Sequence, residues 1–469
     1  MSDAVTGSTN AGVEADRRVL VWVVVAVGLV LAVVGSLGAP LITAVAEHYN
    51  VSLAAAQWTL TIAMLAGAVA TPVLGRLGSG PRRRTVVLAT LGVVVAGSVL
   101  TVLPLPFAVL LVGRAAQGVG GGLIALMMAT ARDHLSEQRS AGTIALLSVA
   151  STAGIGVGYP LAGLLTDVAG IRAAYGLGLA LTVAAFVAAA VVIPHAPPRP
   201  VGRVDVPGAA LLGVALLALL LVISQVDVWR RHTVVAVVVL CAALVLLALW
   251  AVLELRVANP LVDIRLLRQP AVAAANLVML TGGVGMYLLF SLITRYVQTP
   301  AQVGYGFGLD TLQAGLVLVP FSVLGFAAGK LVPRLRDRHS ARVLLGASTA
   351  VVLAAFVIFA TTRQHLAGPV CAMGVLGFGV GAFSAAMPGV ILAATPRAET
   401  ASAMSVNAVV RAVGFATGSA LAGLILAGYT TDVFPTEAGY TAAAWTGIAT
   451  TAVTLLVVAG LRAKPSQPS

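Results

Sequence analysis

The chain has 469 residues, of which 59% are hydrophobic and only 9% are charged, and its mean hydropathy is +1.02. A water-soluble protein of this length needs many more charged residues on its surface, so the composition indicates a membrane protein. The formal net charge of +12 could suggest a nucleic-acid partner. The basic residues, however, lie in short clusters between apolar blocks, and no basic domain exists that could bind DNA or RNA.

The apolar residues form fourteen blocks, most of them near the length of about 20 residues that a membrane-spanning helix needs. Transmembrane strands would be about half as long and would alternate in polarity, which these blocks do not. Helices also satisfy their own backbone hydrogen bonds in lipid. We therefore predict an all-α membrane protein whose fourteen transmembrane helices lie near residues 19–43, 55–75, 85–104, 107–130, 142–165, 173–193, 207–226, 233–253, 271–294, 311–332, 342–361, 367–393, 404–428 and 441–461.

The blocks divide the chain into two six-helix bundles, with two inserted helices between them. The first residues are polar and rich in glycine and serine, which predicts disorder, and the first apolar block is too long for a cleaved signal peptide. The predicted units are a disordered cytoplasmic tail at 1–16, the N-terminal bundle at 17–195, the inserted helices at 196–256, a cytoplasmic connecting loop at 257–270, the C-terminal bundle at 271–462 and a cytoplasmic tail at 463–469.

The distribution of lysine and arginine predicts that both termini are cytoplasmic. On that topology 21 of the 28 basic residues fall in cytoplasmic segments and five in outer segments, while Arg114 and Arg411 fall within helices. Basic loops are retained on the cytoplasmic side during membrane insertion. The sequence therefore predicts a multi-pass protein of the inner, cytoplasmic membrane.

A weak internal repeat relates the two bundles. Gly75 opens a basic loop, and Gly329 opens a similar loop 254 residues later. Two glycines of the fifth block recur in the thirteenth block 260 residues later, as the pairs Gly154 with Gly414 and Gly158 with Gly418. Repeated halves around a midplane site are typical of secondary transporters. Chance is the alternative explanation, because glycines and basic loops are common.

Arg114 lies several residues inside the fourth block, and Gln117 follows one helical turn later. An ionisable group in hydrocarbon is costly, so we expect Arg114 to face the bundle interior and to pair with carbonyls, a carboxylate or water. Gly118 and Gly122 would allow a neighbouring helix to approach closely. We interpret Arg114 as part of a gate or a proton relay; the alternative is an arginine that snorkels to the outer interface.

The fifth block carries Gly154, Gly158, Pro160 and Gly163. Glycines four residues apart form a smooth face for helix packing, and Pro160 removes a backbone hydrogen bond and can kink the helix. We predict that this helix controls the movement between the two bundles. Ordinary packing of small residues is the alternative.

The loop that starts at Gly75 is short and turn-rich and ends in Arg82, Arg83 and Arg84. Anchoring of the loop on the anionic inner leaflet would explain the three arginines. It would not explain Gly75, so we also predict a conformational role for this loop.

Arg411 lies about two turns inside the thirteenth block, and Asn407 precedes it by one turn. A cavity or inter-bundle contact and a snorkelling arginine are both compatible with this depth. The apolar, weakly charged interior suggests a lipophilic or amphiphilic substrate that is neutral or anionic. Arg114 and Arg411 would favour an anion. The candidate residues for a substrate cavity or gate are Ser36, Arg114, Gln117, Tyr159, Asn276, Tyr287, Asn407 and Arg411.

None of the 16 acidic residues falls in the middle of a predicted span. A proton-coupled transporter usually needs a buried group that changes charge during the cycle. The candidate proton sites are therefore peripheral: Asp133 at an inner helix end, and Glu47 and Asp167 at outer helix ends. For Asp133, an interfacial pair with Arg132 is the alternative.

Enzyme signatures are missing from the chain. It contains no HExxH, no GxSxG and no nucleotide-binding GxxxxGK[ST] sequence, so neither an enzyme nor ATP-driven export by this chain is expected. Cys241 and Cys371 lie inside apolar blocks and fit neither a metal site nor a disulfide framework. We predict no cofactor and no metal.

These motifs, in this order, resemble the major facilitator superfamily, and specifically its fourteen-helix drug:proton antiporters. The loop at Gly75 is similar to the family's cytoplasmic motif between helices two and three, and Arg114 matches the arginine of the helix-four motif. The segment 154–163 resembles the antiporter motif of helix five. Further matches lie in the loop after the inserted helices, at 254–256 and 260–268, and in helix thirteen, at Asn407 and Arg411.

Two departures from the family pattern concern charge. Ser79 stands where the loop of the family has an acidic residue, and Arg82 where it has its second glycine, so the charge-relay partner of the loop is predicted to be missing. Leu31 stands where helix one of the family often carries an aspartate, which weakens the case for cationic drugs and for standard proton coupling.

The resemblance implies two bundles that rock around a midplane site, and transport by alternating access. We therefore expect a proton-gradient-driven exporter of drugs, antibiotics or secondary metabolites, whose partners are a small lipophilic or amphiphilic molecule, protons and the lipid bilayer. An importer or lipid-handling carrier of the same fold is one alternative. A membrane sensor or scaffold that transports nothing is another.

Overall fold

The structure is a computed structural model that describes most of the chain. The residues outside the description are 1, 39–40, 52, 79, 196–204, 225, 258–259, 261–263, 266–268, 337, 394, 397–398, 431–433 and 461–469. Within helices, the side chains of residues 2–17, 43, 53–54, 57, 151–153, 155–156, 206, 224, 226–227, 230, 271 and 311 are also outside it. The predicted C-terminal tail and most of the predicted connecting loop fall in these gaps.

The described residues form helices joined by short connections. The helices are α1 (Ser2–Ser36), α2 (Ile42–Tyr49), α3 (Leu53–Leu77), α4 (Arg83–Val102), α5 (Phe107–Val119), η1 (Gly120–Gly122), α6 (Leu123–His134), α7 (Glu137–Ala169), α8 (Ile171–Val192), α9 (Val206–Ser224), α10 (Val226–Arg231), α11 (Thr233–Glu254), α12 (Pro270–Gln298), η3 (Ala301–Val303), α13 (Thr311–Val317), α14 (Val319–Arg336), α15 (Ala341–Thr362), α16 (Ala367–Ala393), α17 (Thr400–Gly428) and α18 (Glu437–Gly460).

Within the described part of the chain, twelve helices are long and apolar enough to cross a membrane. The all-helical prediction is thereby confirmed, but the count of fourteen spans is not. The apolar segment Pro207–Ile223 of α9 is shorter than the others. The helix α7 has 33 residues and is outside the twelve.

Two predicted blocks are interrupted, and one predicted loop is helical. The block at 107–130 contains the short 3-10 turn η1 where three glycines follow one another, and the block at 311–332 is divided into α13 and α14. Helix α1 extends back to Ser2, over the residues for which the sequence predicted a disordered tail. Extending a helix that already exists avoids the cost of nucleation, which low hydrophobicity alone does not reveal.

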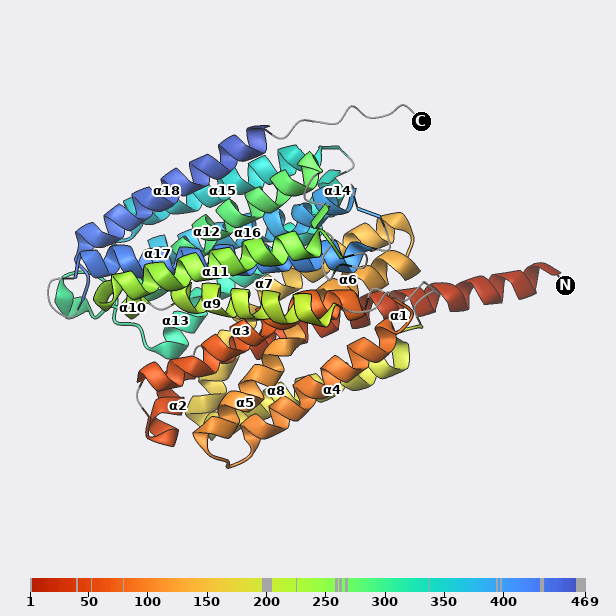
Figure 1. Ribbon diagram of the computed structural model, residues 1–469, viewed down its shortest axis with the longest axis horizontal. Coiled ribbons are helices and arrows are strands. Elements are labelled where there is room, and N and C mark those ends of the chain that lie inside the picture. The colour runs from red at the N-terminus through yellow and green to blue at the C-terminus, as the bar shows by residue number, and fades with distance from the viewer. Residues whose placement is uncertain are drawn as a thin grey trace.

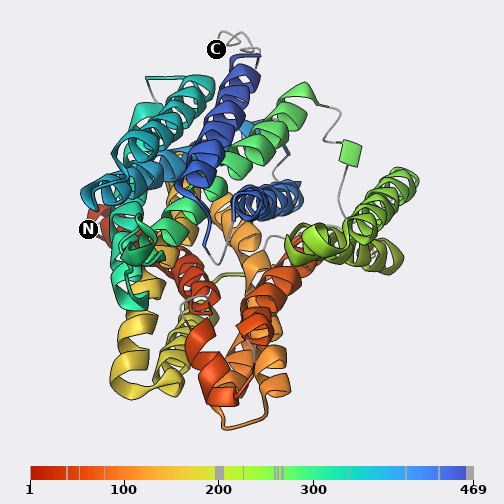
Figure 2. The same cartoon turned by 90° about the vertical axis from the view of Figure 1, so that its left-hand side faces the viewer.

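The helices are grouped into two halves that lie side by side (Figure 1), and the view along the bundle separates them clearly (Figure 2). The N-terminal half contains α1 to α8, and the C-terminal half contains α12 to α18. Figure 2 shows α9 and α11 at one side of the bundle. Helix α9 packs on α3 of one half and on α17 of the other, whereas α11 packs on α9.

The glycines of the predicted repeat make equivalent contacts in the two halves. Gly154 and Gly158 of α7 pack against α1, and Gly414 and Gly418 of α17 pack in the same way against α12. The repeat also extends to the contacts between the halves, because α3 packs on α17 and α14 packs on α7. The equivalence of these pairs confirms that the weak sequence repeat is structural.

Two helix backbones approach each other closely inside the N-terminal half where α5 crosses α3 at Gly118. A Cβ added at Gly118 would overlap the backbone carbonyl of Ala63, and a Cβ at Gly67 would lie 2.8 Å from the carbonyl oxygen of Gly118. Backbone atoms cannot move aside as a flexible side chain can. Only glycine therefore permits this helix separation, as in other membrane helix contacts.

We predict that Gly118→Ala destabilises the protein by about 1–3 kcal/mol, the usual cost of overpacking. The matched control is Gly176→Ala in α8, where an added Cβ meets nothing within 4 Å; it should be neutral or stabilising by roughly 0.5–1 kcal/mol, since alanine favours helix. The measurement is the thermal unfolding midpoint of each purified variant in detergent. Equal midpoints for the two variants would show that the α3–α5 contact does not depend on glycine.

Candidate functional site

Arg114 is completely buried inside the N-terminal half. Its guanidinium donates hydrogen bonds to the carbonyls of Val34 in α1 (3.1 Å) and Thr59 in α3 (3.1 Å), and to Oε1 of Gln117 (2.7 Å). The expected inward orientation and pairing with carbonyls are therefore present. The bonds join α5 to α1 and α3, so Arg114 fixes the relative positions of three helices.

Gln117 extends this polar cluster to a fourth helix. Its amide nitrogen donates to the hydroxyls of Ser98 (3.0 Å) and Thr101 (3.3 Å), both in α4. Ser98 and Gln117 are buried. The sequence placed Arg114 and Gln117 among the cavity residues; the structure places them within one half, apart from the described residues that line the cavities between the halves.

Ser36 and the glycines of α7 form the contact between α1 and α7. The hydroxyl of Ser36 donates to the carbonyls of Val33 (2.7 Å) and Gly154 (3.3 Å), and Gly158 packs against the same hydroxyl. Further along α7, Pro160 lies against Gly315 of α13, across the boundary between the halves. The motif predicted from the glycines thus packs α7 on both halves.

A small cavity lies between the halves. Its volume is about 20 Å³, enough for one water molecule, and its lining includes Asn407 and Arg411 of α17 with residues of α6, α7, α12 and α16. The amide of Asn407 donates to Oδ1 of Asn276 in α12 (3.3 Å). Of the cavity residues proposed from sequence, the structure thus brings together Asn276, Asn407 and Arg411.

The two predicted tyrosines lie on opposite halves. Tyr159 is half-buried in α7. Tyr287, in α12, stacks on Phe290 and on Phe415 of α17, with ring centroids 5.4 and 5.0 Å apart. Such offset aromatic pairs contribute to packing, so Tyr287 supports the α12–α17 contact.

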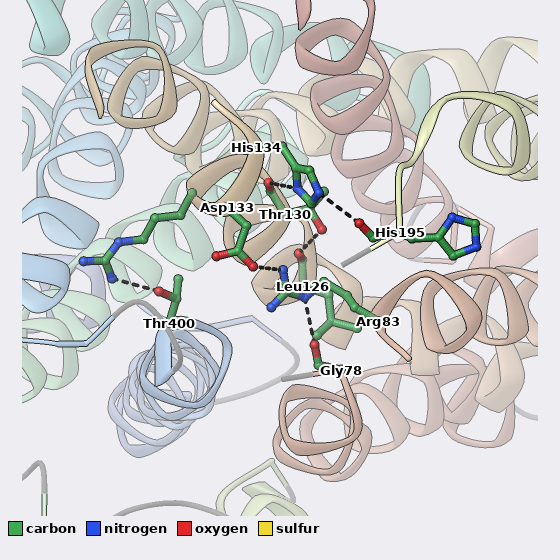
Figure 3. A network of polar contacts seen from close by, with 9 residues as sticks. Gly78, Arg83, Leu126, Thr130, Asp133, His134, His195 and Thr400 are labelled. Atoms are coloured by element: carbon green, nitrogen blue, oxygen red, sulfur yellow. Dashed lines mark hydrogen bonds and ion pairs between the residues drawn. The ribbon is translucent and has the colours of Figure 1, made fainter. Parts of the chain in front are cut away.

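The end of the molecule that the basic loops predict to be cytoplasmic carries a buried ion pair that was not predicted from the sequence. Arg83 lies 2.5 Å from Asp133 at the end of α6, and both side chains are 2% exposed. Arg83 also donates to the carbonyl of Gly78 at 2.8 Å, and Figure 3 shows these groups side by side. The prediction that the loop lacks an acidic partner is wrong: the partner comes from α6, 50 residues later in the chain. Ser79 itself lies outside the described residues.

Arg132, next to Asp133, bridges the two halves. Its guanidinium donates to the hydroxyl of Thr400 (2.8 Å) and to the carbonyls of Leu392 (3.0 Å) and Thr395 (3.1 Å), around the connection between α16 and α17. Gly75 of α3 packs on Ser405 of α17 close by. These contacts join the two halves at the end predicted to be cytoplasmic, and we call this set the cytoplasmic closure.

The remaining arginines and histidines of this end strengthen the N-terminal half. Arg84 donates to the carbonyl of Ala190 in α8 at 2.6 Å, whereas Arg82 is exposed. His134 lies 3.1 Å from the carbonyl of Thr130 and 3.2 Å from that of His195 (Figure 3). The loop motif therefore contributes one buried ion pair and one helix contact, and its third arginine faces outward.

Two overlapping cavities lie between α7, α14 and α16 at the end predicted to be cytoplasmic, with volumes of about 200 and 560 Å³. Both are lined by Glu137 and Arg336, and the smaller one also by Arg132 and Pro388. Pro388 lines the small central cavity as well. The two sites are thus adjacent at Pro388.

Of the three predicted proton sites, only Asp133 is buried. Glu47 and Asp167 are exposed, at α2 and at the last turns of α7. Asp133 is held by Arg83 next to the cytoplasmic closure. In the part of the chain that the structure describes, no cluster of three or more histidine, cysteine or acidic side chains could hold a metal ion.

The comparison with protein families decides what kind of molecule this is. The family model of the Major Facilitator Superfamily matches residues 23–419. The chain belongs to this superfamily. It is therefore a multi-pass membrane transporter of small molecules, and not an enzyme.

Relatives within the superfamily include named export proteins. The chain is 29% identical over 304 residues to the cephamycin export protein CmcT of Amycolatopsis lactamdurans, covering 64% of this chain and 61% of that protein. It is 26% identical over 380 residues to the multidrug resistance protein Stp of Mycobacterium tuberculosis, covering 80% of this chain and 69% of that protein. The matched segments thus span about two thirds of the length of these relatives.

Solved structures confirm the fold. The human organic anion transporter MFSD10 superposes with a TM-score of 0.68 at 16% identity, covering 94% of this chain and 99% of that chain. The fucose:proton symporter FucP of E. coli superposes with a TM-score of 0.63 at 12% identity, covering 95% and 98%. At these identities the likeness shows a major-facilitator-type fold and nothing about substrate.

We predict that Arg83→Gln and Asp133→Asn each destabilise this transporter by roughly 3–5 kcal/mol, because each leaves one buried charge without its partner. The double variant should lose less than either single variant, since neither charge then remains. Thermal unfolding midpoints of the purified proteins in detergent provide the measurement. Arg82→Gln, which removes the exposed neighbouring arginine, is the control and should match the wild type. Simple addition of the two single effects in the double variant would contradict the ion pair.

Proposed function

We propose that the chain is a secondary transporter that exports drugs, antibiotics or secondary metabolites across the cytoplasmic membrane, driven by the proton gradient. The direction and the substrate class are supported by the names of relatives such as CmcT and Stp. The sequence identities to these relatives are below 30%, so the proposed mechanism is argued from the fold and the site of this chain.

The cytoplasmic closure is the observation that supports alternating access. The contacts that hold the two halves together there include the hydrogen bonds of Arg132 to the α16–α17 connection and the packing of Gly75 on Ser405. Water can replace the hydrogen bonds of the Arg132 guanidinium when the halves separate. Gly75 has no side chain that would interlock with α17 and hold the halves together. In this proposal the halves separate at the closure, and the central cavity opens to the cytoplasm.

The fourteen-helix subfamily is part of the proposal. Its support is that α7, with 33 residues, and α9, with 19 residues, are helices additional to the twelve apolar spans. The pair α9–α11 would then be the inserted pair, packed outside the two bundles. An even number of spans places both termini on the same side of the membrane, and the basic loops predict that this side is the cytoplasm.

Coupling to protons is proposed from the likeness to antiporters, with Asp133 as the strongest of the three candidate sites. Protonation of Asp133 would remove the charge that holds Arg83, beside the residue that bridges the halves. A proton could thus loosen the cytoplasmic closure. Glu47 and Asp167 are exposed at the outer end and have no comparable connection to it.

The proposed cavity residues are Asn276, Tyr287, Asn407 and Arg411 in the C-terminal half and Tyr159 in the N-terminal half. We propose an indirect role for Ser36, Arg114 and Gln117. They hold the helices of the N-terminal half in place and so position this half of the cavity. Gly75, Gly154, Gly158, Pro160 and Gly163 are proposed to guide the movement at the helix contacts.

A disulfide across the closure tests alternating access. In a variant without the native cysteines, Gly75→Cys with Ser405→Cys places the two Cβ atoms about 3.0 Å apart, so the helices must move apart by about 0.5 Å to reach the usual disulfide distance of roughly 3.5–4.5 Å. Oxidation should stop export, measured as the accumulation of antibiotics and dyes in a host that lacks its own pumps, and a reductant should restore it. An uncoupler should raise accumulation in the same way.

The control pair joins two helices of one half. Gly285→Cys with Thr451→Cys links α12 to α18, with Cβ atoms about 3.9 Å apart, and its oxidation should leave export unchanged. Full export with the closure cross-linked would contradict movement at this end. Equal accumulation with and without the protein, over a broad panel, would contradict the exporter itself.

A further inference from the structure

Arg411 differs from the other deeply placed arginines in having no partner. It is half-buried in α17 and lines the central cavity, yet it has no hydrogen bond or ion pair with any residue that the structure describes. Arg83 is paired with Asp133, Arg363 with Glu437, and Arg114 with backbone carbonyls. A cation inside a membrane protein is costly, so an unpaired one on a cavity wall indicates a place for an anionic group.

The other described residues around this cavity are apolar or are neutral hydrogen-bonding groups. The walls are formed by Met128, Met279 and Met404 with Ile124, and none of the described lining residues is acidic. The hydroxyl of Ser384 has no hydrogen-bond partner within the described part of the chain. The cavity, which has room for one water molecule, must widen as the halves separate before it can hold a substrate. A ligand with an apolar body and one anionic group would then satisfy both the walls and the guanidinium, whereas a cation would be repelled by Arg411.

The adjoining cytoplasmic cavity has the same electrostatic preference. It is lined by Arg132 and Arg336, with Glu137 as the acidic residue among the described lining groups, and it meets the central cavity at Pro388. Basic residues at an entrance raise the local concentration of anions. An anion that enters from the cytoplasm would therefore pass Arg336 and Arg132 before it reaches Arg411.

We propose that Arg411 binds the anionic group of the exported substrate, and that the membrane potential drives export by pulling the empty, positively charged cavity back toward the cytoplasm. The proposal rests on the exporter function above and specifies its substrate class. When a monovalent anion neutralises Arg411, the loaded cavity moves without net charge, and the empty cavity returns with one positive charge toward the negative cytoplasm. Each cycle thus carries one negative charge outward.

This coupling needs no titrating carboxylate in the cavity, in agreement with its described lining. A potential of about 100 mV corresponds to roughly a fifty-fold concentration ratio for a monovalent anion. The electrical part of the proton gradient alone would therefore suffice for export.

The test uses energised inside-out membrane vesicles that contain the full-length protein, with vesicles lacking it as background. The anionic probes are benzylpenicillin, fusidate and 1-anilinonaphthalene-8-sulfonate, and the cationic probes are ethidium and tetraphenylphosphonium. We expect uptake of at least one anion that valinomycin with potassium abolishes and nigericin leaves intact. Arg411→Gln should reduce this uptake at least about tenfold, whereas Arg411→Lys should retain a substantial part of it because the charge remains.

Arg338→Gln removes an exposed arginine and serves as the matched control, and size-exclusion profiles establish that all variants are folded. Three results would overturn the inference: anion uptake that is undiminished in Arg411→Gln, uptake that depends on the pH gradient instead of the potential, or transport of the cations alone. The last two would leave the exporter function standing. Absence of transport for every probe would reject both proposals.

Discussion

The structure depends on the close approach of helix backbones at glycine. Lipid tails are as apolar as leucine side chains, so the hydrophobic effect does little to hold helices together within the membrane, and tight packing must replace it. Gly118 brings α5 onto the backbone of α3, and the equivalent pairs Gly154–Gly158 and Gly414–Gly418 bring α7 onto α1 and α17 onto α12. Each half is thereby rigid before any polar contact is counted.

Rigid halves concentrate the possible movement at their boundary. Within the N-terminal half, Arg114 and Gln117 add buried hydrogen bonds that join four helices. Between the halves, at the end predicted to be cytoplasmic, the partly exposed Arg132 instead donates to one hydroxyl and two carbonyls. Separation there exposes groups that water can solvate, which costs far less than opening a half. The same chain is therefore stiff inside each half and separable between them.

The sequence predicted those features that a single helix carries within itself. Apolar block lengths gave the helices, the spacing of Gly154 and Gly158 marked a packing face, and the burial cost of Arg114 required its inward orientation. The internal repeat was visible in the sequence because glycines at equivalent positions make the same kind of helix contact in both halves. The break at Gly120–Gly122 and the division between α13 and α14 were missed, because an apolar block continues through them.

Features that join distant parts of the chain were out of reach. The partner of Arg83 was sought at position 79, within the loop, but it lies at Asp133 on another helix. The position of α9 across α3 and α17 could not be predicted either, since apolar residues on all sides of a helix do not specify which neighbours they meet. The sequence left two interpretations of Arg411 open, a cavity or inter-bundle contact and a snorkelling arginine. It gives the depth of Arg411 in its helix, but it does not show which residues lie beside it.

The buried arginines differ in whether another group of the chain compensates their charge. Arg83 is neutralised by a carboxylate, and Arg114 is surrounded by carbonyl dipoles, so neither can attract a mobile ion. Arg411 is left as the uncompensated charge on the wall of the central cavity. Because like charges near a fixed cation are strongly disfavoured in a medium of low dielectric constant, this one side chain should decide the sign of the substrate.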